Sequence, residues 1–435
     1  MKTNMQKYPA YKDSGVEWLG KIPSHWYTLS NKNIFKLKKN QVGKKSCDYV
    51  LLSLTLNGVI KRDMENPQGK FPAEFNTYQE VKKGDFIFCL FDVEETPRCV
   101  GLSDFDGMIT GAYTVMEPYE NFERNFLYYF YLNLDADKRL KPLYTGLRNT
   151  ISKENFFSFK TYVPPLPEQT AIAAFLDRKT TLIDQAIGIK QKQIELLKER
   201  RQIHIHNAVT RGLNPNVKMK DSGVEWIGEI PEGWEVTSVK HVLEMPICDG
   251  PHTTPQLYEE GYPFVSAEAI KNGEVDFDKI RGFISLKDYL QFSKKYLPKR
   301  NDIYMVKSGA TTGNVAMVRT DAEFSIWSPL AVFRANQKKI IPNYLLNYLE
   351  SPSFRLGVEL NWSFGTQQNI GMGILSNLPI AFPSIQEQKV ISEYIGQITD
   401  KIKSAISLKV QEIEKLKEYK ATLINSAVTG KIKVC

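Results

Sequence analysis

Residues 12–26 read KDSGVEWLGKIPSHW, and residues 220–234 read KDSGVEWIGEIPEGW. The two segments lie 208 positions apart and are identical at 11 of 15 positions. A second repeat follows, because residues 168–212 begin EQTAIAAFLD and end NAVTRG, while residues 387–430 begin EQKVISEYIG and end SAVTG. Self-similarity of this kind indicates a repeated architecture. The chain is therefore a tandem duplication of a short head, a variable body and a long tail segment.

The tail segments have the apolar spacing of long helices that pair with each other. Apolar residues recur at alternating intervals of four and three, with Lys190 and Lys409 filling the same position in the two copies. This heptad pattern predicts a coiled-coil seam. The predicted helix-pairing residues are Ile183, Ile187, Ile194 and Leu197 in the first tail and Ile402, Ile406, Ile413 and Leu416 in the second.

Capping signals mark the ends of both tail helices. Ser384 and Glu387 form the pattern of a capping box, and Gly212 and Gly430 are placed to end the helices. Each helix would hold about 40 residues and be roughly 60 Å long. Because a whole body separates the tails, we expect the two helices to pack antiparallel.

The bodies, residues 27–163 and 235–382, contain short apolar runs separated by Gly, Pro, Asn and Asp, which is typical of strands. The expected strands include residues 48–54, 84–90, 112–116, 301–307 and 314–319, and short helices are expected at 122–134 and 342–350. Weak echoes, such as GDFI at 84–87 against NDIY at 301–304, indicate one fold with diverged surfaces. A second echo pairs Gly146…Ile151 with Gly365…Ile370.

The predicted fold class is α+β. Two mixed, mostly β domains are separated by two long helices that form an antiparallel coiled coil, in a pseudo-two-fold tandem repeat. The 435 residues, of which 42% are hydrophobic, can bury sizeable cores, so disorder is excluded as the main state. The net charge of +8 permits nucleic-acid binding without demonstrating it.

Other classes of protein are disfavoured by what the sequence lacks. The five cysteines are scattered without a C-x-x-C pair, so neither a zinc site nor a disulfide framework is expected. The N-terminus has no apolar signal, and no apolar run approaches the ~18 residues of a membrane span. We therefore expect a cytoplasmic protein with no membrane partner.

No motif of a catalytic centre is convincing. Residues 214–217 do not form the Asn/Asp-Pro-Pro-aromatic loop of an amino methyltransferase, and residues 309–314 lack the Gly-Lys-Ser/Thr ending of a phosphate loop. Residues 80–82 match part of a nuclease pattern, but no partner carboxylate can be assigned to them. We predict a non-enzymatic chain with no catalytic residue, no metal site and no cofactor of its own.

The two heads, the segments PLPEQ at 165–169 and PSIQEQ at 383–388, and the duplicated head-body-helix order together resemble the specificity subunit of type I restriction-modification systems. The resemblance covers essentially the entire chain. It implies that the bodies are target-recognition domains and that the tails are the conserved helices of the family. The implied boundaries are 1–163 for the first head and recognition domain, 164–212 for the central helix, 213–382 for the second head and recognition domain, and 383–435 for the distal helix.

The same resemblance implies the partners of the chain. Each recognition domain would read one half of a bipartite site in double-stranded DNA, while the helices space the halves and dock modification (methyltransferase) subunits. Restriction (endonuclease/translocase) subunits would join these. S-adenosylmethionine, ATP and Mg are expected on the partner subunits. Because the two bodies differ in sequence, the target should be asymmetric, and changing the helix length should change only the spacing between its halves.

Residues that contact DNA should lie on exposed loops, because Arg, Lys, Asn, Gln, Ser and Thr can reach base edges or phosphates from there. For any single residue, a role in a tight turn or at a solvated surface stays open as an alternative. In the first body the candidates are Lys44, Lys45, Lys61, Arg62, Thr145, Arg148 and Asn149. In the second they are His252, Thr253, Thr254, Lys307, Ser308, Thr311, Thr312, Gln367 and Gln368.

Two other functions compete with DNA recognition by a subunit of a complex. A DNA methyltransferase in its own right would bind its cofactor, but the loops for cofactor and target base are missing. A coiled-coil protein scaffold without sequence-specific DNA binding would leave the divergence of the two bodies unexplained.

Overall fold

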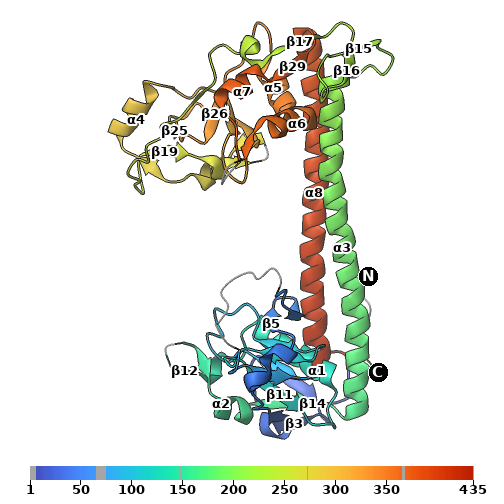
Figure 1. The fold of residues 1–435 in the computed structure, drawn as a ribbon. Helices are drawn as coiled ribbons and strands as arrows, with labels where there is room; N and C mark the ends of the chain where they lie inside the picture. Colours follow the sequence, from blue (N-terminus) through green and yellow to red (C-terminus); the bar gives the residue numbers. More distant parts are fainter. Residues whose placement is uncertain (1–5, 65–74, 147, 272, 365–367, 435) are drawn as a thin grey trace. The chain divides into compact units, whose positions relative to one another are not determined.

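The computed structural model describes residues 6–64, 75–146, 148–271, 273–364 and 368–434. It divides into two compact units, the first made of Met1–Lys190 with Gln411–Cys435 and the second of Gln191–Val410. Each unit thus combines one body with a part of both long helices (Figure 1). Within the described residues, no helix has the length and apolar character needed to cross a membrane.

The two long helices are α3 (Leu166–Arg211), with 46 residues, and α8 (Ile385–Val428), with 44. Helix α8 begins where its capping residue predicts, since Ser384 Oγ accepts a hydrogen bond from the backbone N–H of Glu387 at 3.4 Å. Glu168 and Glu387 provide the acidic first turns, where negative charge is stabilised by the helix dipole.

The helices run antiparallel in each unit, which confirms the prediction. In the first unit Asp184 pairs with Lys420 at 2.7 Å and Lys190 with Glu412 at 2.6 Å, so the numbers rise along α3 as they fall along α8. In the second unit the side chain of His204 lies 3.0 Å from the Tyr394 hydroxyl. The buried members of the predicted seam are Ile183, Ile194, Ile402 and Ile413, and the half-buried members are Ile187, Leu197, Ile406 and Leu416.

The first body contains a four-stranded sheet in the order β4-β11-β8-β9. Its strands are β4 (Phe35–Leu37), β8 (Phe86–Phe88), β9 (Val100–Leu102) and β11 (Thr114–Pro118), and the helices are α1 (Arg124–Ala136) and α2 (Lys153–Ser158). The smaller pairs are β3 (Tyr27–Ser30) with β14 (Lys160–Val163), β5 (Leu52–Thr55) with β6 (Gly58–Lys61), β7 (Gln79–Val81) with β10 (Gly107–Ile109), and β12 (Tyr144–Thr145) with β13 (Thr150–Ile151).

The second body contains a six-stranded sheet in the order β18-β26-β23-β24-β21-β20. Its strands are β18 (Cys248–Asp249), β20 (Ile270–Lys271), β21 (Gly273–Val275), β23 (Ile303–Val306), β24 (Val315–Met317) and β26 (Leu330–Phe333). The other strands are β17 (Glu235–Ser238), β19 (Tyr262–Val265), β22 (Phe283–Ile284), β25 (Ser325–Ile326), β27 (Ser363–Phe364), β28 (Gln368–Asn369) and β29 (Pro379–Phe382). Its helices are α4 (Leu286–Ser293), α5 (Pro342–Leu349), α6 (Pro352–Asn361) and α7 (Met372–Asn377).

The bodies share one core topology, as the weak sequence echoes predict. The order β4-β11-β8-β9 in the first body corresponds to β18-β26-β23-β24 in the second. Asp85 and Asp302 occupy matching places just before the central strand, and each accepts a backbone N–H from the residue three positions earlier, at 2.7 and 2.8 Å. Asp85 also pairs with Lys38, and Asp302 pairs with Arg334, each at 2.7 Å.

The predicted start of one strand is wrong. Residues 48–54 read as a strand, but Gly43–Asp48 forms a 3₁₀ helix that the backbone bond from Tyr49 N–H to Ser46 O closes at 3.3 Å. Strand β5 begins only at Leu52. The local bonds of this segment outweigh the strand preference of its apolar residues.

The heads are small hairpins, β1 (Tyr11–Asp13) with β2 (Lys21–Pro23) and β15 (Met219–Asp221) with β16 (Glu229–Pro231). The carboxylates of Asp13 and Asp221 each accept the backbone N–H two residues later at 2.9 Å, which turns the chain sharply. The repeated sequence is therefore repeated in its local structure.

Candidate nucleic-acid interface

In the second body, one edge of the sheet collects the loops that the sequence singles out. Strands β18 and β23 end there, at Asp249 and Val306, and β26 begins there, at Leu330, because neighbouring strands are antiparallel. The loops 250–254 and 307–313 therefore leave the sheet from the same edge. Helix α4 and strands β19 and β25 lie on the side of this body away from α8 (Figure 1).

A third segment, the hairpin β27–β28, joins the same surface. Ser308 forms an isolated β-bridge with Asn369, and the backbone N–H of Ile370 donates to the Lys307 carbonyl at 2.9 Å. The structure thus brings together the three segments of the second body that contain the predicted contacts.

A buried carboxylate lies beneath this surface. Asp249, with 1% of its side chain exposed, has Lys295 Nζ at 2.6 Å from Oδ1, Lys307 Nζ at 3.1 Å from Oδ2 and His252 Nε2 at 3.2 Å from Oδ2. Among the described residues no well-directed hydrogen bond reaches Oδ2, so the contacts at that atom are electrostatic. Burial acts to raise the pKa of Asp249, but the two lysines outweigh it and hold the pKa below its ordinary value.

Some of the predicted residues of the second body have exposed side chains, whereas the side chains of others are buried or bonded within the protein. His252, Thr253, Thr254 and Thr311 are exposed. Ser308 is half-buried, and only 14% of the Lys307 side chain is exposed, its ammonium being turned toward Asp249. Thr312 is buried and donates its hydroxyl to the Gly309 carbonyl at 2.7 Å, which is the geometry of a tight turn. Gln367 lies outside the described residues, and Gln368 is placed in β28 by its backbone.

The first body presents the corresponding edge. Strands β4 and β8 end and β11 begins there, and the hairpin β12–β13 is attached by a bond from Ile151 N–H to the Leu90 carbonyl at 2.7 Å. This bond corresponds to that between Ile370 and Lys307. The Arg148 carbonyl accepts the N–H of Asp92 at 3.0 Å, so the backbone is anchored while the Arg148 side chain is exposed.

Two other predicted residues of the hairpin stabilise it. Thr145 Oγ1 donates to the Thr150 carbonyl at 3.0 Å, and Asn149 donates to Glu95 at 3.3 Å. Asn149 has a φ of 44°, a left-handed conformation that asparagine tolerates better than most residues. Thr145 and Asn149 thus stabilise the hairpin, while the side chain of Arg148 between them is exposed.

The basic pairs of the first body lie on separate segments. Lys44 and Lys45 are exposed on the 3₁₀ helix that follows β4. Lys61 ends β6 and lies 4.9 Å from the centre of the Phe105 ring, a cation–π contact, while the backbone N–H of Arg62 donates to the Leu51 carbonyl at 2.9 Å. Lys61 and Arg62 are therefore outside the four-stranded sheet.

Sequence reasoning places Asp249 at the start of the candidate loop without giving it a role, and it misses Lys295 as a member of this site. Lys295 follows α4, 46 residues after Asp249. No spacing rule links them, because the fold of the whole body brings them together. The described residues include no group of three or more His, Cys, Asp or Glu placed to hold a metal ion.

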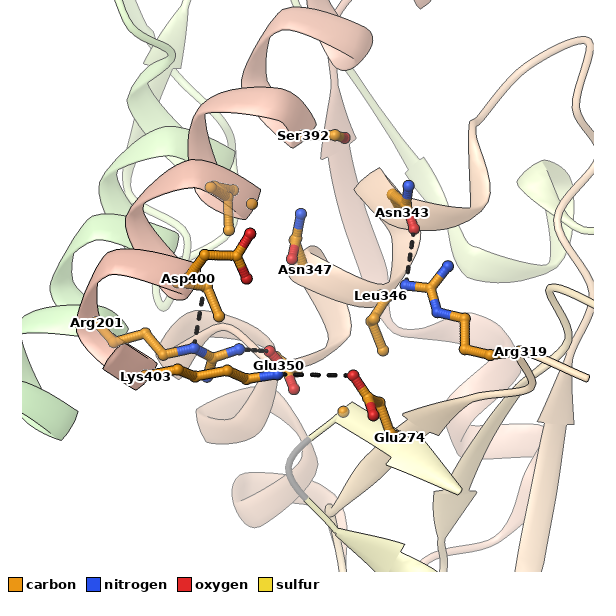
Figure 2. Close-up of a pocket in the computed structure, with 14 residues that line it drawn as sticks. Arg201, Glu274, Arg319, Asn343, Leu346, Asn347, Glu350, Ser392, Asp400 and Lys403 are labelled. Carbon is orange, nitrogen blue, oxygen red and sulfur yellow. Dashed lines mark hydrogen bonds and ion pairs between the residues drawn. The ribbon is translucent and has the colours of Figure 1, made fainter. Parts of the chain in front are cut away.

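A cavity of about 200 Å³ lies where the second body meets the helices (Figure 2). Four of its charged groups form two ion pairs, since Arg201 of α3 lies 2.7 Å from Glu350 and Lys403 of α8 lies 3.6 Å from Glu274. Figure 2 shows these side chains turned toward each other across the cavity. The arrangement suits a joint between body and helices better than a ligand site.

In comparisons with known proteins, the chain matches one family model and several proteins that are named as specificity subunits. Residues 100–199 and 231–416 match the family described as the type I restriction modification DNA specificity domain. The MjaVIII specificity subunit of Methanocaldococcus jannaschii is 27% identical over 67% of this chain and 66% of its own length. The putative MjaX specificity subunit of the same organism is 24% identical over 96% of both chains, and the EcoBI specificity subunit of Escherichia coli is 27% identical over 54% of this chain and 50% of its own.

Solved structures show the same fold. A chain from work on complex assembly and conformational transition of the type I R-M system has a TM-score of 0.65 at 16% identity, covering 94% of this chain and 98% of that one. The HsdS subunit from Thermoanaerobacter tengcongensis has a TM-score of 0.50 at 16% identity, covering 97% and 100%.

Proposed function

Because the chain belongs to the type I restriction-modification DNA specificity family, we propose that each of its bodies reads one half of an asymmetric, bipartite site in double-stranded DNA. One observation carries the proposal. Both bodies present the corresponding edge of the four strands that their sheets have in common, with a hairpin attached by an equivalent bond, but with different side chains. A common frame with different polar groups at its edge suits two half-sites of different sequence.

The helices would set the spacing between the half-sites and dock the modification subunits. Support comes from α3, which has apolar residues at intervals of seven that are not covered by its partner helix. In the first unit Leu182 and Ile189 are 54% and 60% exposed, and in the second unit Leu196 and Ile203 are 53% and 51% exposed. Exposed apolar residues in such a row are typical of a protein-interaction surface.

The chain itself would recognise DNA and not modify it. Methylation of adenine with S-adenosylmethionine would take place on the modification subunits, and ATP and Mg would act on the restriction subunits. The relatives that match are named as specificity subunits, which supports this division of labour.

The test is a single-molecule methylome of cells with and without this chain, with the modification subunit retained. We expect methyladenine at one asymmetric, gapped motif to be lost when the chain is removed. If every motif persists, a pull-down with the tagged chain tells two cases apart. Capture of the modification subunit identifies a silent system, while failure to capture it contradicts the proposal.

A further inference from the structure

The acid-base cluster around Asp249 lies where three loops of the second body meet. Burying a carboxylate is costly unless basic groups compensate for the lost water, and three basic side chains lie within 3.2 Å of this one. Two of these side chains come from the loops of the candidate interface, His252 and Lys307, and the third, Lys295, follows α4. Removing the carboxylate would therefore act on several loops at once.

The loop that follows Asp249 has little freedom at its start. A Cβ atom on Gly250 would lie 2.1 Å from the Ile326 carbonyl oxygen, so the backbone is pressed against β25 at this point. Lys295 also donates to the Gly250 carbonyl at 3.3 Å. The exposed side chains of His252, Thr253 and Thr254 thus belong to a loop whose backbone is held in place at Gly250.

Lys307 connects this loop to the hairpin β27–β28. Its ammonium faces Asp249, while its carbonyl accepts the N–H of Ile370 at 2.9 Å. In the first body, the carbonyl of Leu90 accepts the equivalent bond from Ile151 at 2.7 Å, but the side chain at this position is apolar. An ionic link through this position is therefore a feature of the second body.

We propose that Asp249 is a positioning residue that sets the base preference of the second body, by holding the loop 250–254 and Lys307 at a fixed separation. The inference rests on the proposed DNA recognition. Asp249 itself is too deeply buried to contact a base edge, so it acts through His252 and Lys307 and through the threonines that their loops expose. Lys307 then links the two loops, because its ammonium is directed toward the buried Asp249.

The experiment uses the complete chain assembled with its modification subunits. Methylation is measured on a library of sites in which each position of both half-sites is varied. In Asp249→Asn, we expect discrimination at one or more positions of the second half-site to fall about tenfold, which is the usual effect of one imperfect base contact. The profile of the first half-site should stay unchanged. The double variant with Lys307→Met should be no worse than Asp249→Asn, because both changes break the same link.

Asp249→Asn leaves buried positive charge and can reduce folding, so Lys295→Met provides a second variant. Lys295 is half exposed, and its loss should relax the same positions to a smaller extent. Lys294→Met removes an equal charge one residue away and is the matched control. A merely structural role would lower methylation of all sites alike and leave the base preference intact.

The outcomes separate the two proposals. An unchanged second-half profile in both Asp249→Asn and Lys295→Met, with a normal gapped motif in the wild type, overturns the positioning role alone. The absence of any gapped motif with the wild-type complex overturns DNA recognition, and the positioning role with it.

Discussion

Trp26 donates its indole N–H to Glu168 Oε1 at 3.0 Å, although 142 residues separate the two in the sequence. The same bond recurs in the second unit, where Trp234 donates to Glu387 at 3.3 Å. The head tryptophan and the acidic first turn of the long helix, which the sequence repeats as separate motifs, are thus two parts of one joint. Trp26 is 1% exposed, so this joint is inside the first core.

Trp26→Phe should lower the free energy of unfolding by about 2 kcal/mol, since hydrogen bonds to charged groups contribute roughly 1.5–3 kcal/mol. The measurement is urea unfolding followed by circular dichroism. Trp327→Phe is the matched control, because within the described part of the chain the buried indole N–H of Trp327 has no acceptor. Equal losses in the two variants would contradict a contribution from the bond to Glu168.

Much of this fold follows from the sequence, and the reason is periodicity. The heptad pattern around Ile183 and Ile402 predicts the paired helices, and the repeated heads predict two units. The pattern cannot reveal which segments share a core. Ala427 and Val428, near the end of α8, pack in the first core with Trp26, because an antiparallel helix returns to the unit where its partner began. The cluster around Asp249 likewise depends on packing between distant segments.

The helix pair allows a comparison of two isoleucines on one helix of one unit. Ile183 is 7% exposed and Ile189 is 60% exposed. Ile183→Ala should destabilise the protein by about 3 kcal/mol, as is usual for a truncated buried isoleucine, whereas Ile189→Ala should change stability by less than about 0.5 kcal/mol. Both are measured by urea unfolding.

Ile189 also tests the proposed docking of the modification subunit on the exposed face of α3. Ile189→Ala should weaken capture of the modification subunit in a pull-down while the folded fraction, measured by circular dichroism, stays the same. Undiminished capture by Ile189→Ala would argue against docking on the exposed face of α3 in the first unit.

The lowered pKa of His206 leads us to expect that the stability of the second unit depends on pH. His206 Nδ1 lies 2.8 Å from Ser353 Oγ, and burial lowers its pKa below the ordinary 6.5, with a smaller contribution from Arg211. Below pH 6.5 the unfolded chain therefore binds a proton more readily than the folded one, so this contribution is complete above pH 6.5 and is lost as the pH falls. The slope is at most about 1.4 kcal/mol per pH unit.

Urea unfolding at pH 7.5 and 5.5 measures this effect. His206→Gln should reduce the difference in unfolding free energy between the two pH values, because glutamine does not titrate. His241→Gln, which replaces an exposed histidine of the same unit, is the control for the exchange of histidine for glutamine. A His206→Gln variant that keeps the full pH dependence would assign it to other groups.

Arg148 offers the most direct test of reading by the first body. Its carbonyl anchors the hairpin through Asp92, so Arg148→Ala removes the exposed side chain and keeps the backbone bond. If the guanidinium contacts a base edge, discrimination at one position of the first half-site should fall by about tenfold or more. If it contacts a phosphate, methylation should fall at all sites and become more sensitive to salt, because phosphate contacts carry no sequence information. Arg178→Ala, an exposed arginine on α3, controls for the loss of charge. An Arg148→Ala complex with wild-type base preference and salt dependence would remove this residue from the interface.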